Sequence, residues 1–185
     1  MKVLVTGAAG FIGSAVSARL KAQGHEVLGL DSISDYYDQN LKKMRIAHFL
    51  TQNKIKFEKV DIALLDQFQE VYKRFSPDAV IHLAAQAGVR TPNTRLTNYV
   101  GANLVGFTNV LQTVVESNTS IFLYASSSSV YGNSSTAPYS ENEKNLTPTS
   151  FYGTSKLANE IFVKSVLTNS STKVAGMRLD RKSTR

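Results

Sequence analysis

Two residues near the carboxyl end of the chain have the types and the spacing that proton transfer requires. Tyr152 and Lys156 are four residues apart within residues 151–168, where the sequence predicts a helix, so both side chains point to one face. Tyrosine, with an ordinary pKa of about 10, is a poor base at neutral pH. A unit positive charge about 4 Å away favours the phenolate by up to about 4 kcal/mol at an effective dielectric constant of about 20. The pair therefore indicates a tyrosine base assisted by a lysine, with an exposed tyrosine beside an unrelated lysine as the alternative.

A glycine-rich turn at the amino end indicates a second chemical feature. Gly7, Gly10 and Gly13 follow the apolar run 2–6 and open a segment with helical spacing over residues 11–23. In such a unit the first glycine permits the tight turn, the second lets the backbone approach a pyrophosphate, and the third lets helix and strand pack closely. The helix N-terminus adds unpaired N–H groups and a positive potential. The turn therefore predicts a dinucleotide site, with a purely structural turn as the alternative.

An acidic residue supports the dinucleotide interpretation and favours one cofactor. A second apolar run, residues 26–30, ends in Asp31, about twenty residues past the glycine turn. A carboxylate at this position accepts hydrogen bonds from the adenosine ribose of NAD and repels the 2′-phosphate of NADP. We therefore expect NAD as the cofactor, while a loop cap is the alternative role for Asp31.

These residues must be positioned by a regular array of strands and helices. Apolar runs predict strands at 2–6, 26–30, 56–60, 79–83, 120–125 and 173–179, and amphipathic spacing predicts helices at 11–23, 41–52, 64–72, 98–117 and 151–168. Ile12, Ala15, Val16 and Leu20 give the first helix its expected buried face. Strands that alternate with helices, through connections too long for hairpins, predict a Rossmann-like, doubly wound α/β fold with a parallel sheet covered on both faces. Residues 126–150 are rich in Ser, Asn and Pro and are expected to form a loop.

Composition excludes several other classes of protein. The chain has 185 residues, is 42% apolar and 19% charged, and contains no cysteine, so a single globular domain is expected without disulfides or thiolate metal sites. The three histidines are scattered singly, and we expect no metal. The sequence has neither a signal-peptide pattern nor a run long enough to span a membrane, so we expect a cytoplasmic protein that does not bind membranes.

The net charge of +7 does not by itself indicate nucleic-acid binding. A large part of it comes from the end of the chain, where Arg178 stands before the basic segment 180–185. Lys42, Lys43 and Arg45 form the other dense basic group, for which a solvated helix face is the first interpretation and phosphate contact the second. We therefore expect no nucleic-acid partner.

Four motifs in order resemble the extended short-chain dehydrogenase/reductases. They are Thr6-Gly-x-x-Gly-x-x-Gly13, Asp31, Ser126-Ser-Ser-Ser-Val-Tyr-Gly132 and Tyr152-x-x-x-Lys156. Within that superfamily the chain is most similar to nucleotide-sugar epimerases, and above all to the UDP-glucuronate 4-epimerases. The segments that carry this closer resemblance are Asp35-Tyr-Tyr-Asp38 with Leu41-Lys-Lys43, and His82-Leu-Ala-Ala-Gln-Ala-Gly-Val-Arg90.

The resemblance implies roles for individual residues. The catalytic residues would be Ser127, Tyr152 and Lys156, with Tyr152 as the base, Ser127 bound to the sugar O4, and Lys156 holding the nicotinamide ribose. The cofactor-binding residues would be Gly7, Gly10, Phe11, Ile12, Gly13, Asp31, Asp61, Ile62, Ala84, Ala85, Gln86, Asn103, Tyr152 and Lys156. Among them, Asn103 would act as a positioning residue. The substrate-binding residues would be Arg90, Ser127, Ser128 and Ser129.

The resemblance also implies a reaction and partners. A UDP-sugar would be oxidised transiently at C4 by NAD⁺ and reduced again from the other face. The triplet Ser127-Ser-Ser129 argues against a resemblance to the related 4,6-dehydratases, which carry Thr-Asp-Glu at these positions. A homodimer through residues 98–117 and 151–168 is expected, because the first of these helices has an apolar stripe wider than one sheet contact needs.

The end of the chain departs from the family pattern. The resemblance covers residues 1–179 as an NAD-binding domain, whereas residues 180–185 form an atypical basic tail and the family's carboxyl-terminal substrate-binding portion is expected to be absent. Residues 91–97 also depart from the family, which weakens the assignment of Arg90. Two alternatives to the UDP-glucuronate epimerase therefore stay open: an NAD-binding fragment without turnover, and another extended reductase such as a UDP-glucose 4-epimerase.

Overall fold

The computed structural model describes residues 1–88, 96–133, 138–168 and 170–180. Its strands are β1 (Lys2–Thr6), β2 (Glu26–Asp31), β3 (Lys56–Lys59), β4 (Ala79–His82), β5 (Ile121–Ser127) and β6 (Lys173–Leu179). Its α-helices are α1 (Phe11–Ala22), α2 (Gln39–Arg45), α3 (Leu65–Phe75), α4 (Leu96–Tyr99), α5 (Gly106–Glu116) and α6 (Phe151–Leu167). A π-helical segment, Ile46–Thr51, extends α2, and another, Val100–Val105, joins α4 to α5.

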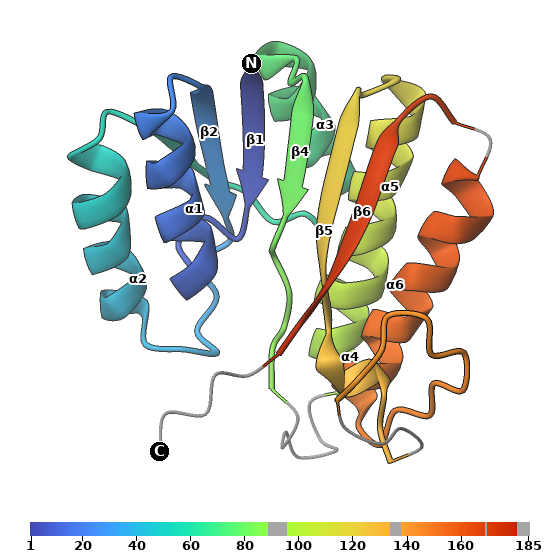
Figure 1. The fold of residues 1–185 in the computed structure, drawn as a ribbon. Helices are drawn as coiled ribbons and strands as arrows, with labels where there is room; N and C mark the ends of the chain where they lie inside the picture. The colour runs from blue at the N-terminus through green and yellow to red at the C-terminus, as the bar shows by residue number, and fades with distance from the viewer. Residues whose placement is uncertain (89–95, 134–137, 169, 181–185) are drawn as a thin grey trace.

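The six strands form one parallel sheet, which confirms the predicted fold class. Their order is β3-β2-β1-β4-β5-β6, so the chain moves outward in one direction from β1 and then in the other from β4. Carboxyl ends of the strands point to the lower edge in Figure 1, and the N-terminus lies at the opposite edge. The crevice between β1 and β4 at this lower edge is the topological switch point, where ligands bind in open α/β sheets.

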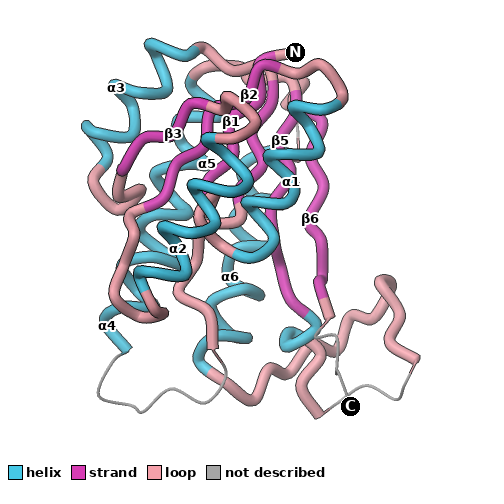
Figure 2. Tube along the Cα trace, turned by 90° about the vertical axis from the view of Figure 1, so that its left-hand side faces the viewer, coloured by secondary structure: helices cyan, strands magenta, loops and turns pink. Residues whose placement is uncertain are grey.

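Alternation along the strands divides the core into two layers. Leu4 of β1 packs with Phe68 and Phe107 of α3 and α5, on one face of the sheet. Its neighbours Val3 and Val5 point the other way, into a smaller cluster that contains Leu50 of the extended α2. Successive side chains of a strand alternate between faces, so one buried run serves both layers. Figure 2 shows the strands edge-on from the β3 side, with helices packed around them.

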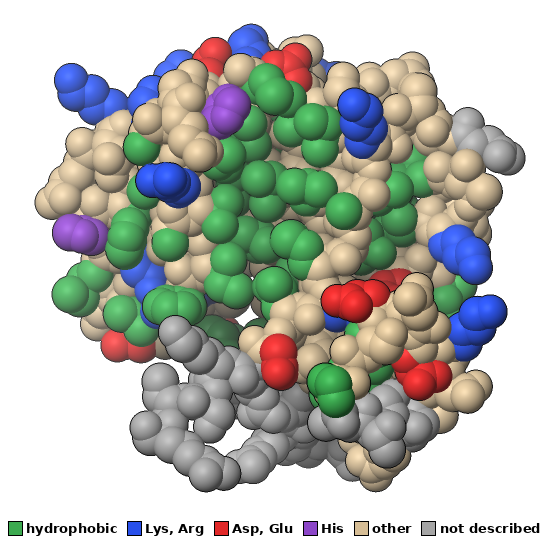
Figure 3. All heavy atoms as spheres, viewed as in Figure 1, with side chains coloured by type: hydrophobic (Ala, Val, Ile, Leu, Met, Phe, Trp, Pro, Cys, Tyr) green, Lys and Arg blue, Asp and Glu red, His purple; other side chains and the backbone are tan. Residues whose placement is uncertain are grey.

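The prediction that both faces are fully covered is wrong for part of the sheet. Figure 1 shows α1 in front of the sheet on the side of β1 and β2, whereas β5 and β6 lie in front of their helices. Apolar side chains gather on this front face in Figure 3. Ile121 and Leu123 of β5 are only partly buried, and Ala175 of β6 is exposed. Within the described residues, therefore, the front of β5 and β6 is an apolar face without a helical cover.

The predicted buried face of α1 is wrong in part. Ile12 and Ala15 are exposed, whereas Leu20 packs against the core. The fully buried positions are Gly13, Ser14 and Ser17. A Cβ added at Gly13 would lie 2.1 Å from the carbonyl oxygen of Gly7. Small side chains allow this close approach of the helix to the turn, and a larger apolar stripe would prevent it.

One further prediction needs correction. Strand β5 continues to Ser127, so the serine run starts within the sheet and not in a loop. This difference arises because the neighbouring strand supplies backbone partners that no local pattern records. Arg178 lies in β6, as the predicted strand 173–179 requires, and forms an ion pair with Glu160 of α6 at 2.9 Å.

We expect Gly13→Ala to lower the free energy of unfolding by about 1–3 kcal/mol, because its methyl group would meet backbone and not a movable side chain. Gly101→Ala is the matched control. Gly101 also lies in a helical segment, but its added Cβ would meet no atom within 4 Å, so the change should stabilise by up to about 1 kcal/mol. Urea unfolding of the two variants and the wild type measures the difference. Equal stability of the two variants would contradict the packing argument.

Candidate functional site

A pocket of about 820 Å³ opens at the carboxyl ends of the strands, at the switch point between β1 and β4. Most of the predicted site residues line it. They are Gly7, Gly10, Ile12, Gly13, Asp31, Asp61, Ile62, Ala84, Ala85, Gln86, Ser127, Ser129, Tyr152 and Lys156. The fold thus brings the glycine turn, the acidic residue after β2 and the tyrosine–lysine pair to one cavity, although they are up to 149 residues apart in sequence.

Four predicted residues are not among those that line this pocket. The ring of Phe11 is 79% exposed and lies beneath Arg45. The Ser128 hydroxyl donates to Asp180 at 2.9 Å and borders a second cavity beside β6. Asn103 is buried behind the pocket wall. Arg90 lies outside the described residues, so its predicted contact with substrate stays a prediction.

The glycine turn forms a cradle that suits a pyrophosphate. Gly7 has a φ of +72°, and a Cβ there would meet the backbone of Leu83 and Ala84 at 2.7 Å. Helix α1 starts at Phe11 without a side-chain cap from its N-cap residue Gly10 and without an acidic residue in its first turn. Its first N–H groups therefore keep their positive potential for an anion in the pocket.

Asp31 is held at the end of β2 by donors from three segments. Its Oδ2 accepts from the Ala9 N–H at 3.3 Å, and its Oδ1 accepts from the Ile33 N–H at 2.8 Å. Oδ1 also lies 3.3 Å from the Lys42 ammonium. The solvated-face interpretation is therefore wrong for Lys42, which is buried, while the adjacent Lys43 is exposed.

Asn103 positions the pocket wall instead of facing the pocket. Its Oδ1 accepts from the Gln86 N–H at 2.7 Å, and its Nδ2 donates to the Gln86 carbonyl at 3.0 Å. The same amide nitrogen donates to the Ser155 hydroxyl at 3.0 Å. One buried amide thereby ties the loop after β4 to α6, the helix that carries Tyr152 and Lys156.

Tyr152 and Lys156 lie on one face of α6, as their spacing predicts. Burial raises the pKa of the Tyr152 phenol above its ordinary value, and a hydrogen bond with Ser127 acts in the opposite direction. The Lys156 ammonium lies 5.9 Å from the centre of the tyrosine ring and donates to the carbonyl oxygen of Ala125 at 2.8 Å. The expected lowering of the tyrosine pKa by Lys156 is therefore not found in this structure, where burial dominates.

Lys156 is itself an unusual group, because it is fully buried. Desolvation lowers the pKa of its ammonium from the ordinary 10.5 to about 8. Lys156 is consequently mainly charged at neutral pH but loses its proton at a far lower pH than an exposed lysine does. A lysine with such a pKa can change its charge within the pH range of an enzyme assay.

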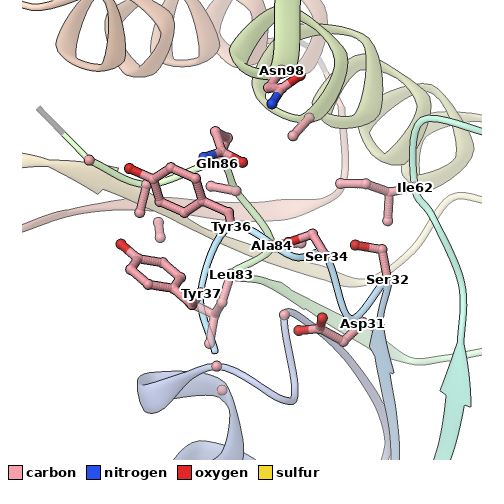
Figure 4. A pocket seen from close by; sticks show the side chains of 18 of the residues that line it. Asp31, Ser32, Ser34, Tyr36, Tyr37, Ile62, Leu83, Ala84, Gln86 and Asn98 are labelled. Carbon is pink, nitrogen blue, oxygen red and sulfur yellow. The ribbon is translucent and has the colours of Figure 1, made fainter. Parts of the chain in front are cut away.

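Sequence reasoning missed the two adjacent tyrosines that line the pocket opposite α6. Figure 4 shows Tyr36 and Tyr37 with their rings close together, and their ring centres are 4.7 Å apart. The Tyr37 phenol is near enough to Tyr152 to contribute to raising the pKa of that residue. In the sequence, these two tyrosines stood out only as part of the segment that resembles the family. Nothing in the residues around them predicts that they line a pocket.

His82 supports the site from below without being able to donate a proton at neutral pH. Burial lowers its pKa from 6.5 to about 3, so the ring is neutral. The His82 Nδ1 and the Thr6 hydroxyl are 2.9 Å apart, and the same hydroxyl accepts from the Ala84 N–H at 3.2 Å. These contacts join the carboxyl ends of β1 and β4 directly beneath the glycine turn.

The described residues contain no group of three or more His, Cys, Asp or Glu side chains that could hold a metal ion. Among the helices that the structure describes, none is long and apolar enough to cross a membrane.

Comparisons with known proteins agree with this architecture. A profile of the NAD dependent epimerase/dehydratase family matches residues 3–181. Over 161 residues the chain is 42% identical to Protein CapI of Staphylococcus aureus, an alignment that covers 87% of this chain and 48% of that protein. Over 159 residues it is 44% identical to UDP-glucuronate 4-epimerase 4 of Arabidopsis thaliana, covering 85% and 36%. The chain thus spans about half, or less, of the length of these relatives.

Solved structures give the same result. UDP-glucuronic acid 4-epimerase from Bacillus cereus, in complex with UDP-glucuronic acid and NAD, superimposes with a TM-score of 0.86 at 33% identity. The match covers 96% of this chain and 56% of that one. The UDP-Glc/GlcNAc 4-epimerase of Campylobacter jejuni also superimposes with a TM-score of 0.86, at 28% identity over 96% of this chain and 52% of its own.

We expect acid to destabilise the protein through His82. The folded-state pKa of about 3 lies below the ordinary 6.5, so between these values the unfolded state binds more protons and stability falls as the pH falls. The full shift corresponds to a loss on the order of 5 kcal/mol. His82→Asn, which keeps a group able to bond Thr6, should flatten the pH dependence of the unfolding free energy between pH 6.5 and 3, as measured by urea unfolding. His48→Asn, at an exposed position, controls for loss of a histidine, and an unchanged slope in His82→Asn would contradict the assignment.

Proposed function

The chain belongs to the NAD dependent epimerase/dehydratase family, and on this premise we propose that it binds NAD and carries the proton-transfer groups of a UDP-glucuronate 4-epimerase. One observation carries the proposal: a single pocket contains the glycine turn, Asp31 and the group Ser127, Tyr152 and Lys156. Named UDP-glucuronate 4-epimerases among the relatives support the choice of sugar.

The residues present suit NAD. The uncapped N-terminus of α1 and the cradle at Gly7 and Gly10 would hold the pyrophosphate, and the Asp31 carboxylate would accept from the adenosine ribose. Lys156 would hold the nicotinamide ribose. When bound, NAD supplies the reversible oxidation at C4 of the sugar, so that the reaction has no net redox change.

The chain's own residues would move the proton. Tyr152 would take the proton from the sugar O4 and return it to the same oxygen after the sugar has turned. Ser127, which is close enough to act on the pKa of Tyr152, would bond O4 and keep it within reach of the phenol. Burial raises the pKa of Tyr152, so removal of the phenol proton needs a positive charge nearby. Lys156 is the buried cation on the same face of α6.

Epimerisation also requires binding of the part of the substrate that does not react. The sugar must turn over while its nucleotide end stays bound, and the described pocket offers groups chiefly to the cofactor and to O4. The relatives are about twice as long as this chain. We therefore assign binding of the substrate's nucleotide to the portion of those proteins that the chain does not span. A cytoplasmic location and the absence of nucleic-acid partners stay predictions from the sequence.

We expect the chain as given to bind NADH but to convert UDP-glucuronate far more slowly than a version joined to the carboxyl half of one of its relatives. Held geometry can supply on the order of 7–11 kcal/mol of a barrier, which the proton-transfer groups cannot replace. Coupled assays of epimerisation measure the ratio, and fluorescence titration measures NADH binding. In the joined version, Tyr152→Phe should lower turnover by about 10²–10⁴-fold while NADH binding is kept. Comparable turnover by the two lengths of chain would refute the prediction.

A homodimer through residues 98–117 and 151–168 is part of the same proposal. Exposed apolar side chains lie in the π-helical segment before α5 and on α6: Val105 is 46% exposed, Ile161 58% and Val166 48%. Sedimentation velocity at micromolar concentration should give a dimer, and the double variant Ile161→Lys, Val166→Lys should give a monomer. Met44→Lys, at an exposed apolar position on α2, is the matched control and should stay dimeric. A wild-type monomer would count against this arrangement.

A further inference from the structure

The carboxylate of Asp31 occupies a cradle of donors at the end of β2. The N–H groups of Ala9 and Ile33 and the ammonium of Lys42 all point at its two oxygens, at 2.8–3.3 Å. The Lys42 ammonium also donates to the hydroxyl of Ser34 at 3.2 Å, so Ser34 helps to hold Lys42 in place. Figure 4 shows Asp31 and Ser34 among the side chains that line the pocket. Two backbone N–H groups and one ammonium are a donor set that suits a phosphate group, with its several acceptor oxygens.

Lys42 is the residue that makes the cradle unusual. Its side chain is only 10% exposed, and its ammonium has the Asp31 carboxylate as its ion-pair partner. A buried ammonium that loses its anion is strongly unfavourable, so removal of the carboxylate leaves Lys42 in need of another. Asp31 thus serves as an internal anion that fills a site able to hold an external one.

We propose that this cradle is a latent site for an adenosine 2′-phosphate, masked by Asp31, and that Lys42 sets how strictly the chain distinguishes NAD(H) from NADP(H). The inference rests on the proposed function, since it takes the adenosine ribose to lie at Asp31. A phosphate on the ribose 2′-oxygen would then arrive where the carboxylate lies. Exchange of Asp31 for a smaller, uncharged residue opens that space and leaves the donors of Ala9, Ile33 and Lys42 directed into it.

The ion pair has a consequence for the wild-type chain as well. Lys42 offsets the charge of Asp31, so the carboxylate repels a 2′-phosphate less than an unpaired one would. Loss of Lys42 should therefore weaken NADPH binding more than NADH binding. Lys43 is the matched control, because it is the adjacent lysine of the same helix but is exposed.

Fluorescence titration with NADH and NADPH tests the proposal on five proteins: wild type, Asp31→Ser, Lys42→Met, the double variant, and Lys43→Met. We expect the wild type to prefer NADH. Asp31→Ser should prefer NADPH by about tenfold or more, which corresponds to about 1.4 kcal/mol, and the double variant should lose that gain. Lys42→Met should raise the preference for NADH over NADPH, and Lys43→Met should leave it unchanged.

The outcomes separate the inference from the function on which it rests. If the wild type binds NADH but Asp31→Ser gains no affinity for NADPH, or if the double variant keeps the gain, the latent site is wrong. If the wild type binds neither nucleotide, the proposed function fails and the inference fails with it. Should Asp31→Ser not fold, the isosteric Asp31→Asn takes its place, and stabilisation of the variant by adenosine 2′,5′-bisphosphate in thermal unfolding is the second readout. An unchanged NADH-to-NADPH ratio in Lys42→Met would overturn the role of Lys42 without any change at Asp31.

Discussion

The site depends on the close contact between α1 and the turn at the end of β1. Because Gly13 lies against the carbonyl of Gly7, the N-terminus of α1 opens directly into the crevice at the switch point. The same turn is tied to its neighbours on both sides. Ala9 donates to Asp31 at the end of β2, and Thr6 connects the turn to the end of β4 through its hydroxyl. These contacts hold the carboxyl ends of β1, β2 and β4 around the N-terminus of α1, so one wall of the pocket is preformed for an anion.

Two buried lysines in this pocket show that the fold can keep an ammonium out of water in different ways. Lys42 has a carboxylate partner, whereas Lys156 has a backbone carbonyl and a pKa that burial lowers to about 8. A paired lysine keeps its charge and organises its neighbours, which suits recognition of a fixed group. A lysine that is held by a neutral oxygen remains responsive to a nearby phenol or ligand, which suits proton transfer.

The sequence predicted the sheet well because its signals are local. Short apolar runs bounded by polar residues gave β1, β2 and β6 almost residue for residue, and helical spacing located α3 and α6. The predicted face of α1 was wrong at its first turn for a physical reason. Hydrophobic periodicity assumes that the larger apolar residues are buried, but the helix starts so close to the glycine turn that the buried positions are the small residues Gly13, Ser14 and Ser17. The strand order and the uncovered front of β5 and β6 also had no local signal.

By itself, the sequence determined the fold class, the glycine turn, the acid after β2 and the tyrosine–lysine spacing, because each depends on residues close together in the chain. The tertiary structure decided which neighbours of these residues take part. Lys42 and Lys43 are adjacent and chemically identical, yet only Lys42 turns inward to Asp31. Adjacent side chains of a helix point to different faces, and the packing of α2 decides which face is turned to Asp31. Likewise Asn103, expected among the cofactor-binding residues as a positioning residue, is buried and holds the backbone of Gln86, and burial raises the pKa of Tyr152 where a lowering by Lys156 was expected. Such outcomes depend on distance and desolvation in the folded chain, which no spacing along the sequence contains.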